Sequence, residues 1–216
     1  KTGYSVYIAD DHKLFRKAMV SLLQTFSRVA LVKDAENGKE LLTLMKQEVP
    51  DVAIVDLQMP IMDGAETCEN IIQKFPEVKI IILTMHDSGN FILRMMDLGV
   101  HAFLLKTTDP DELEKAIYAV AEKDFYHNDL VASVLRKDVK EKRKQTRPLF
   151  QQVVLTEREK EILLLICAEL TMKEIGQRLF LSENTVRNHR VNIMEKTGVN
   201  NIVGLVKYAY ETGLVT

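Results

Sequence analysis

Residues 52–60 read Val-Ala-Ile-Val-Asp-Leu-Gln-Met-Pro, and this stretch decides the fold. Four apolar and mostly β-branched residues run into Asp56, and turn-forming residues follow at once. A continuous apolar run of this length predicts a strand that is buried on both faces of a sheet. Ligands of open parallel sheets bind beyond the carboxyl ends of the strands, so Asp56 stands where chemistry is expected. A single Asp at such a place is more often a cap of a helix or turn, so the other strand ends decide the matter.

The first half of the chain repeats this pattern four more times. Apolar runs at 6–9, 29–32, 78–84 and 102–106 predict strands, and segments with helical apolar spacing separate them. Asp109 and Pro110 start the last helix of the series, as an N-cap followed by Pro at the first helical position. Five strands alternating with helices predict an α/β fold, a doubly wound parallel sheet covered on both faces.

Length and composition bound the class of protein. A chain of 216 residues fits one large domain or two small ones, and 28% charged with 46% hydrophobic residues is ordinary for a soluble protein. No apolar run approaches the roughly 20 residues that span a bilayer, and we expect no signal peptide. Cys68 and Cys167 lack metal-ligand spacing and indicate a reducing compartment, so we expect a cytoplasmic protein.

Charge is divided unevenly along the chain. Residues 1–135 carry 14 basic and 21 acidic side chains, residues 136–147 carry 7 and 2, and residues 148–216 carry 8 of each. This asymmetry suggests two units with different partners. The basic segment either contacts nucleic acid or forms a solvated helix end and tether. We expect domains at 1–124 and 151–216, joined by a helical and basic linker at 125–150.

Polar side chains stand at the carboxyl ends of four predicted strands: Asp10 with Asp11, Asp56, Thr84 and Lys106. Three converging carboxylates repel one another and therefore need a cation. Oxygen ligands favour Mg²⁺, which binds through one or two carboxylates plus phosphate. A carboxylate can also act as a nucleophile and form an aspartyl phosphate, whose oxygens a Lys and a Thr would contact. The site is therefore predicted to accept a phosphoryl group on one aspartate.

These strand ends resemble those of the receiver domains of two-component systems, as do Asp-Leu-Gln-Met-Pro-Ile-Met-Asp-Gly at 56–64 and Phe-Leu-Leu-Lys at 103–106. The resemblance implies a flavodoxin-like fold in which Asp56 is the phosphoacceptor and Mg²⁺ is the cofactor. The implied metal ligands are the side chains of Asp10, Asp11 and Asp56 with the backbone carbonyl of Gln58.

The same resemblance assigns a switch. Thr84 and Lys106 would contact the phosphoryl group, and Thr84 would move together with Phe103, which phosphorylation is expected to draw inward. Met85 is bulkier than the small residue common there, so it is expected to slow access to the phosphoryl group. Lys106 is followed by Thr107 where many receivers have Pro, so we expect no cis peptide bond.

The C-terminal part has the signals of a small four-helix unit. Thr156 and Thr171 are each followed three residues later by Glu, which is the capping-box pattern. Ser182 caps a third helix that runs to about residue 196, and a fourth begins at about residue 201. A short helix, a turn at 180–181 and a Ser-capped longer helix predict a helix-turn-helix.

The third helix of this unit has two distinct faces. Val186 and Ile193 mark the face toward the core, whereas Asn184, Arg187, Asn188 and Val191 lie opposite. Arg and Asn can read guanine and adenine edges, each good pair contributing roughly 1–3 kcal/mol of discrimination. By composition alone a solvated polar face is the more frequent outcome, and a neutral four-helix unit could equally bind protein.

A second resemblance bears on that choice. Leu-Thr-Glu-Arg-Glu at 155–159, Leu-Thr-Met-Lys-Glu-Ile-Gly at 170–176 and Leu-Ser-Glu-Asn-Thr-Val-Arg-Asn-His at 181–189 look like the LuxR-type helix-turn-helix. Together the two halves resemble response regulators of the NarL/FixJ family over essentially the whole chain. One departure is Glu169, where the family usually has Gly, so either Glu169 is left-handed or the helix ends differently. The implied DNA-binding residues are Ser182, Asn184, Thr185, Arg187, Asn188, His189, Val191 and Lys196.

The predicted function is a cytoplasmic transcription regulator that a sensor histidine kinase, or a small phosphodonor, switches by phosphorylating Asp56. Phosphorylation would release the recognition helix, promote a homodimer on double-stranded DNA through the fourth output helix, or both. One rival is a protein-binding adaptor that never touches DNA. The other is a phosphatase, but such enzymes commonly place a second Asp two residues after the nucleophile, where this chain has Gln58. We expect autodephosphorylation at most, and no turnover of a separate substrate.

Overall fold

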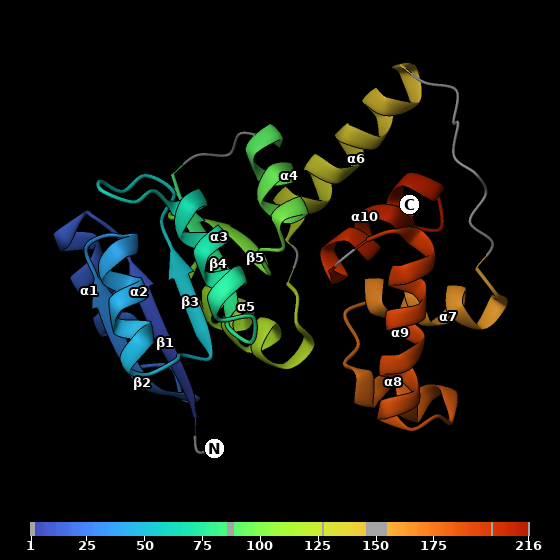
Figure 1. Cartoon of the computed structure of the whole chain (residues 1–216), viewed down its shortest axis with the longest axis horizontal. Helices are drawn as coiled ribbons and strands as arrows, with labels where there is room; N and C mark the ends of the chain where they lie inside the picture. The colour runs from blue at the N-terminus through green and yellow to red at the C-terminus, as the bar shows by residue number, and fades with distance from the viewer. Residues whose placement is uncertain (1–2, 86–88, 127, 146–154, 200, 216) are drawn as a thin grey trace. The chain divides into compact units, whose positions relative to one another are not determined.

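The computed structural model describes residues 3–85, 89–126, 128–145, 155–199 and 201–215. The chain forms two compact units, Lys1–Tyr126 and His127–Thr216 (Figure 1). The strands of the first unit are β1 (Tyr4–Ala9), β2 (Val29–Ala35), β3 (Val52–Val55), β4 (Lys79–Thr84) and β5 (Ala102–Leu105). Its helices are α1 (Lys13–Leu23), α2 (Gly38–Gln47), α3 (Gly64–Lys74), α4 (Gly89–Leu98) and α5 (Pro110–Lys123). The second unit holds α6 (Asp129–Gln145), α7 (Glu157–Cys167), α8 (Met172–Leu179), α9 (Glu183–Thr197) and α10 (Ile202–Thr212).

The five strands form one parallel sheet in the order β2-β1-β3-β4-β5. Helices α1 and α5 pack against the sheet on one face, and α2 and α3 contact each other and the strands on the other. This confirms the predicted doubly wound α/β fold. The strand order reverses between β1 and β3, which makes the carboxyl ends of these two neighbours the expected ligand-binding crevice.

Alternate strand residues build the core. Ile8, Ile54 and Ile81 are fully buried in the cluster that α1 and α5 cover. Burying one such side chain stabilises the fold by roughly 1.5–3 kcal/mol, so the three central strands carry much of the driving force. Strand β2 is longer than its apolar run at 29–32 predicts, because its pairing with β1 continues through Lys33 to Ala35.

Helix starts follow the predicted capping chemistry. Asp109 caps α5 by accepting the backbone N–H of Asp111, and Pro110 takes the first helical position. Asp63, which was not predicted as a cap, caps α3 in the same way, through the N–H of Glu66. The described residues contain no cis peptide bond, as expected at Lys106.

The second unit packs its helices around the buried side chains of α7, α9 and α10. Thr156 and Thr171 both form complete capping boxes, as predicted. Glu169 has a φ of 59°, so the helix before it ends through a left-handed residue without glycine. Helix α6 contacts α10 within this unit.

The domain limits at 124 and 151 remain predictions. The end of the predicted linker falls at 146–154, outside the described residues. No helix in the described part of the chain is long and apolar enough to cross a membrane.

Candidate functional site

Four strands deliver polar side chains to one edge of the sheet. Asp10 directly follows β1, Asp56 follows β3, Thr84 ends β4 and Lys106 follows β5. The Lys106 Nζ lies 2.7 Å from Asp10 Oδ2 and 2.6 Å from Asp56 Oδ2. The structure thus brings together a lysine and two carboxylates that are 46 or more residues apart in the chain, and it buries all three.

Asp56 is held through its backbone and both carboxylate oxygens. Its N–H donates to the carbonyl of Ala9 at 2.9 Å, and its Oδ1 accepts the N–H of Leu57 at 2.7 Å. The residue is only 4% exposed. Burial raises the pKa of the Asp56 carboxyl above its ordinary value, and the hydrogen bond from Lys106 opposes this without cancelling it.

Gly64 allows α3 to start against the Asp56 backbone. A Cβ on Gly64 would stand 2.3 Å from the carbonyl oxygen of Asp56 and 2.7 Å from the Cα of Leu57. No carbon fits at these distances, so only glycine permits this approach. The N–H of Gly64 donates to the Leu57 carbonyl at 2.9 Å and fixes the turn between strand and helix.

The lysine remains a cation at this site. Burial disfavours the charged ammonium, but hydrogen bonds to Asp10 and Asp56 outweigh it and raise the pKa of Lys106. Its Nζ also lies 4.8 Å from the centroid of the Phe15 ring. Lys106 therefore supplies a fixed positive charge beside the Asp56 carboxylate.

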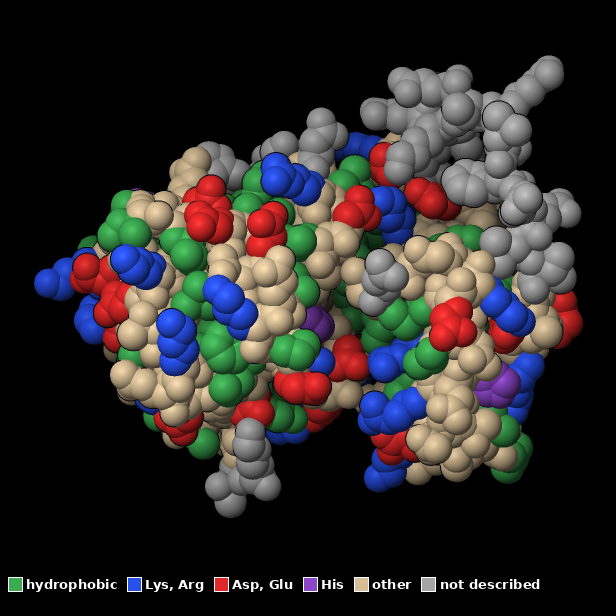
Figure 2. Space-filling view, in the orientation of Figure 1, with side chains coloured by type: hydrophobic (Ala, Val, Ile, Leu, Met, Phe, Trp, Pro, Cys, Tyr) green, Lys and Arg blue, Asp and Glu red, His purple; other side chains and the backbone are tan. Residues whose placement is uncertain are grey.

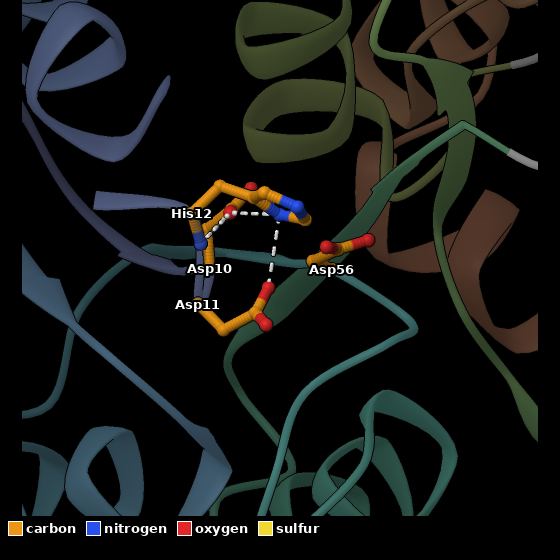
Figure 3. A group of neighbouring side chains, drawn as sticks. All are labelled: Asp10, Asp11, His12 and Asp56. Carbon is orange, nitrogen blue, oxygen red and sulfur yellow. Dashed lines mark hydrogen bonds and ion pairs between the residues drawn. The ribbon is translucent and has the colours of Figure 1, made fainter. Parts of the chain in front are cut away.

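Asp10, Asp11, His12 and Asp56 form a group that could hold a metal ion (Figure 3). Each offers one ligand atom, and these atoms all lie within 4.8 Å of one another. Three carboxylates are the oxygen donors that Mg²⁺ takes, so the residues fit this ion. Gln58 is exposed two residues beyond Asp56, at the start of the turn.

His12 belongs to this group although we did not predict it. Its Nδ1 lies 3.0 Å from Asp11 Oδ1 and 3.5 Å from Asp10 Oδ1. Its backbone N–H donates to Asp10 Oδ1 at 2.9 Å. The signal in the sequence was its position directly after two aspartates at a strand end.

Thr84 and Phe103 lie on the neighbouring strands β4 and β5. Thr84 is fully buried, and its carbonyl accepts the N–H of Lys106 at 2.8 Å. Phe103 is 2% exposed. We expected phosphorylation to draw Phe103 inward. In this structure Phe103 is already buried.

Exposed apolar side chains stand on the segments that leave the acidic edge. Leu14 is the second residue of α1, Ile61 lies between β3 and α3, and Met85 follows Thr84. Ile61 has a φ of 72°, which is strongly disfavoured for a β-branched residue. An exposed apolar residue in a disfavoured backbone region, five residues after Asp56, is a candidate for a functional constraint.

The second unit presents the polar face of α9. Asn184, Arg187, Asn188 and Val191 are exposed, whereas Val186 and Ile193 are fully buried, which confirms the predicted orientation of the helix. On the visible face of this unit, Lys and Arg side chains lie over α8 and α9 (Figure 2).

Several of the predicted DNA-binding residues have partners within the unit. Ser182 accepts the N–H of Thr185 as the N-cap, and the two hydroxyls lie 2.7 Å apart. Arg187 pairs with Glu183 on the helix surface at 2.7 Å. His189 is half-buried.

Residues outside α9 hold it in place. The Lys196 Nζ donates to both carboxylate oxygens of Glu159 on α7, at 2.6 and 2.8 Å. Arg158 donates to the carbonyl of Leu179 at the end of α8. A Cβ on Gly176 would stand 2.7 Å from the carbonyl of Leu181, so this glycine permits the tight turn between α8 and α9. The capping role of Glu159 was predicted from the sequence, whereas its ion pair with Lys196 was not.

Comparisons with known proteins agree with this architecture. Residues 6–118 match the response regulator receiver domain, and residues 153–209 match the bacterial regulatory proteins of the luxR family. The chain is 32% identical over 222 residues to the transcriptional regulatory protein DegU of Brevibacillus brevis, with 97% of this chain and 94% of DegU covered. It is 34% identical over 212 residues to the response regulator protein VraR of Staphylococcus saprophyticus, with 97% and 98% covered.

Solved structures give the same result. The structure of a complex of the two-component response regulator RcsB with DNA matches with a TM-score of 0.58 and 26% identity, covering 97% of this chain and 98% of RcsB. Another matching structure holds two RcsB dimers bound to two parallel DNAs. This chain belongs to the response regulators that join a receiver domain to a LuxR-type helix-turn-helix domain, the NarL/FixJ family.

Proposed function

We propose that this protein is a DNA-binding transcription regulator whose first unit accepts a phosphoryl group on Asp56. The observation that carries the proposal is the buried Asp56 carboxylate with the Lys106 ammonium 2.6 Å from its Oδ2. In a transfer from a phosphohistidine of a sensor kinase, a carboxylate oxygen of Asp56 attacks phosphorus. The bond from phosphorus to the imidazole nitrogen of that histidine breaks. The electron pair of that bond remains on this nitrogen, and the imidazole, which carries a proton on its other nitrogen, leaves as a neutral ring.

The residues around Asp56 then bind the new group. The Lys106 ammonium is placed to pair with a phosphoryl oxygen, because it already contacts the oxygen that is modified or its neighbour. The Thr84 hydroxyl would bind a second oxygen, and Phe103 occupies the adjoining interior. Mg²⁺, held by Asp10, Asp11, Asp56 and the Gln58 carbonyl, would neutralise the charge that develops on the phosphoryl oxygens. Water can later attack phosphorus and release inorganic phosphate with the free Asp56 carboxylate, so the protein would dephosphorylate itself without acting on another substrate.

A sensor histidine kinase is the partner that suits this edge of the sheet. Leu14, Ile61 and Met85 are exposed apolar side chains on the segments that follow β1, β3 and β4. A protein donor could pack on such side chains, whereas a small phosphodonor needs no such surface. Leu14→Asp should therefore slow phosphoryl transfer from the kinase at least about tenfold, as loss of a central apolar contact of about 1.4 kcal/mol would. The rate with acetyl phosphate should remain unchanged. Equal slowing with both donors would show that Leu14 acts on the site itself.

The second unit would carry the output. Asn184, Arg187 and Asn188 are exposed on one face of α9, as base-reading side chains must be, and the α9 N-terminus with Ser182 and Thr185 would contact phosphate. The matching RcsB complexes, with DNA and as dimers on DNA, support DNA as the partner and a homodimer as the bound form. A regulator of this kind would act in the cytoplasm, where the bacterial chromosome is.

The acceptor residue is tested by mass spectrometry after treatment with acetyl phosphate and Mg²⁺. We expect the wild type to gain one phosphoryl group, Asp56→Asn to gain none, and Asp63→Asn to behave as the wild type. Asp63 is the matched control because its carboxylate caps α3 seven residues away, outside the acidic group. A phosphoryl group found on another residue of the wild type would refute the assignment.

The output is tested by sedimentation velocity and by DNA binding. Beryllofluoride with Mg²⁺ should convert a monomer to a dimer in the wild type and have no effect on Asp56→Asn. Arg187→Ala with Asn188→Ala should abolish specific duplex binding, whereas Lys160→Ala, which removes an exposed cation of α7, should preserve it. Specific binding that survives the double substitution would place the DNA surface elsewhere.

A further inference from the structure

Arg16 is a buried cation that takes no part in the proposed phosphoryl transfer. It lies on α1 and its residue is only 3% exposed. Its position continues the buried stripe of Met19 and Leu23, three and seven residues further along the helix. Burying a guanidinium costs several kcal/mol unless its hydrogen bonds are satisfied, so a buried arginine needs a structural or functional reason.

Three nitrogen atoms of Arg16 each have a separate acceptor. Nε donates to Asp34 Oδ2 at 3.0 Å, and Nη2 donates to Glu36 Oε1 at 2.8 Å. Nη1 donates to the backbone carbonyl of Asp10 at 2.5 Å. The guanidinium therefore links the carboxyl end of β1 to the carboxyl end of β2, with α1 as its base.

The network is electrically balanced. Lys17 also pairs with Asp34, at 3.0 Å, so two cations, Arg16 and Lys17, face two carboxylates, Asp34 and Glu36. Its formal charges cancel, and it therefore adds little field at the neighbouring acidic group. Its effect on that group must be geometric.

The geometry acts on the peptide between Asp10 and Asp11. The N–H of Asp10 donates to the carbonyl of Ala35 at 3.1 Å, and the carbonyl of Asp10 accepts from Arg16. Because a peptide unit is planar, fixing this carbonyl also fixes the direction in which the chain enters Asp11. Asp11 is exposed at the mouth of the site, and its described ion pair is with His12, itself exposed. The direction of the Asp11 carboxylate therefore depends on the peptide that Arg16 holds.

We propose that Arg16 is a positioning residue for the divalent cation, because it orients the Asp10–Asp11 peptide so that both carboxylates face Asp56. This inference rests on the proposed function, in which these three carboxylates hold the ion. Groups that orient metal ligands typically change metal affinity by roughly 10–100-fold when they are removed. The backbone N–H of Arg16 also donates to the carbonyl of His12 at 2.9 Å, and a substitution keeps that bond. The only described hydrogen bond from the Arg16 side chain to the acidic group is the one to the Asp10 carbonyl, so replacing the side chain tests this one link.

Mn²⁺ provides the probe, since the free ion is measured directly by electron paramagnetic resonance with the full-length protein. Arg16→Gln should weaken Mn²⁺ binding by roughly 10-fold or more. Arg16→Lys keeps the charge but has one donor group in place of the planar fork, and it should give an intermediate affinity. Lys17→Gln is the matched control, since it removes the other cation on Asp34 without touching Asp10, and it should leave the affinity within about twofold.

Phosphorylation kinetics separate positioning from general damage. With acetyl phosphate, Arg16→Gln should be slow at limiting Mg²⁺ and should recover most of the wild-type rate at saturating Mg²⁺. A rate that stays low at saturating Mg²⁺, or a Mn²⁺ affinity equal to that of the wild type, overturns the proposal. So does a loss of affinity that Lys17→Gln reproduces.

Two further variants keep the outcome decisive. If Arg16→Gln does not fold, Glu36→Ala removes one exposed anchor of the guanidinium and should weaken Mn²⁺ binding about threefold. Glu48→Ala, which removes a comparable surface carboxylate paired with Lys33, should not weaken it. Equal affinities of these two variants would overturn the proposal. If instead wild type binds no Mn²⁺, or Asp11→Asn binds it as the wild type does, the proposed metal site fails and not merely the role of Arg16.

Discussion

Charged side chains are buried around Asp56 and exposed on α9. Asp10, Asp56 and Lys106 are enclosed and pair with one another, and burial shifts the pKa of Asp56 upward. On α9, Asn184, Arg187 and Asn188 face solvent, and the ion pair between Lys196 and Glu159 lies at the end of the helix. Transfer of a phosphoryl group needs fixed charges in a protected place, whereas reading DNA needs side chains that another molecule can reach.

The two regions nevertheless use the same device to set their geometry. Gly64 lies against the Asp56 carbonyl, and Gly176 lies against the Leu181 carbonyl just before Ser182. In each case a helix can approach the functional segment only because the glycine has no side chain. The two regions differ in the burial of their charged side chains but share this close backbone approach. We therefore expect function to depend on the backbone next to each site as much as on its polar side chains.

The largest expected effect comes from filling these two positions in turn. Gly64→Ala should push the Asp56 backbone away and slow phosphorylation by acetyl phosphate more than about 100-fold, because misplacement of about 1 Å can cost that much. It should leave the second unit folded. Gly176→Ala should disrupt the α8–α9 turn, abolish specific DNA binding and leave phosphorylation unchanged. The measurements are the phosphorylation rate and a DNA titration with each variant.

Both variants should be compared with Gly198→Ala. Gly198 also ends a helix, with a φ of 72°, but among the described residues no atom beyond its chain neighbours and its own helix backbone lies within 4 Å of the position of its Cβ. This variant should be strained by about 1 kcal/mol without moving either site. If Gly64→Ala or Gly176→Ala behaves like Gly198→Ala, the close approaches do not control function.

Lowering the pH should destabilise the first unit more than the second. The Nδ1 of His101 accepts the N–H of Ile80 at 3.1 Å, between β4 and β5, and burial lowers the pKa of His101 to about 4 from 6.5. Histidine is thus neutral in the folded state and protonated in the unfolded chain below 6.5. Its contribution is present above pH 6.5 and is lost as pH falls toward 4, by up to about 3 kcal/mol.

Hydrogen exchange at each unit between pH 7 and pH 4.5 measures this difference. Protection of β4 and β5 should fall, and His101→Asn, which retains an acceptor but does not titrate, should remove this pH dependence. In the second unit the hydrogen bond from Lys196 lowers the pKa of Glu159 below its ordinary value of 4.5. Stability from Glu159 is therefore present above pH 4.5, and α7 and α9 should keep their protection. Parallel loss in both units would contradict the assignment to His101.

Removing the contact between Lys196 and Glu159 should have a smaller effect on stability. It tests whether Lys196 stabilises the second unit or contacts DNA phosphate. Side-chain exposure is 6% for Glu159 and 42% for Lys196, so solvent screens the pair in part. Lys196→Met should cost about 1–2 kcal/mol of the stability of the second unit and lower DNA affinity with it. A lysine that contacts phosphate would also reduce the slope of log affinity against log salt by about 1.

We expect that slope to remain unchanged in Lys196→Met, because the ammonium is already engaged within the unit. Glu159→Gln should destabilise the unit in the same way and also leave the slope unchanged. A slope that falls only in Lys196→Met would show that the lysine leaves Glu159 for the DNA backbone.

The pattern of the sequence was sufficient for the sheet, because five apolar runs with polar ends leave little choice of topology. Asp10, Asp56 and Lys106 could be predicted to converge, since parallel strands end at one edge. Arg16 could not be assigned a partner, although a charge in register with the buried stripe of α1 was visible. Its acceptors are Asp34 in β2, Glu36 just after β2 and a backbone carbonyl, and none of these has a signature in the sequence.

The same limit applies to contacts between helices and to backbone strain. Glu159 was recognised as part of a capping box, which is local, but its pair with Lys196 spans 37 residues. Glu169 was recognised as a departure, and its left-handed backbone shows how the helix tolerates it. The turn at Phe180 was predicted, but its left-handed backbone was not, because a left-handed aromatic residue at the end of α8 is a property of the packed turn.

Phe180 provides the smallest and most discriminating test of the recognition unit. It has a φ of 55° and is 97% exposed, so the described structure gains no burial from it and keeps it in a disfavoured backbone region. Phe180→Gly should remove about 1 kcal/mol of strain, partly offset by the entropy of the glycine, and raise the urea midpoint of the unit slightly. Phe180→Ala, which remains left-handed, should not raise it. If DNA affinity is unchanged in both variants, DNA reading is confined to α9. A loss of affinity common to both would show that the aromatic ring itself extends the DNA-binding surface into the turn.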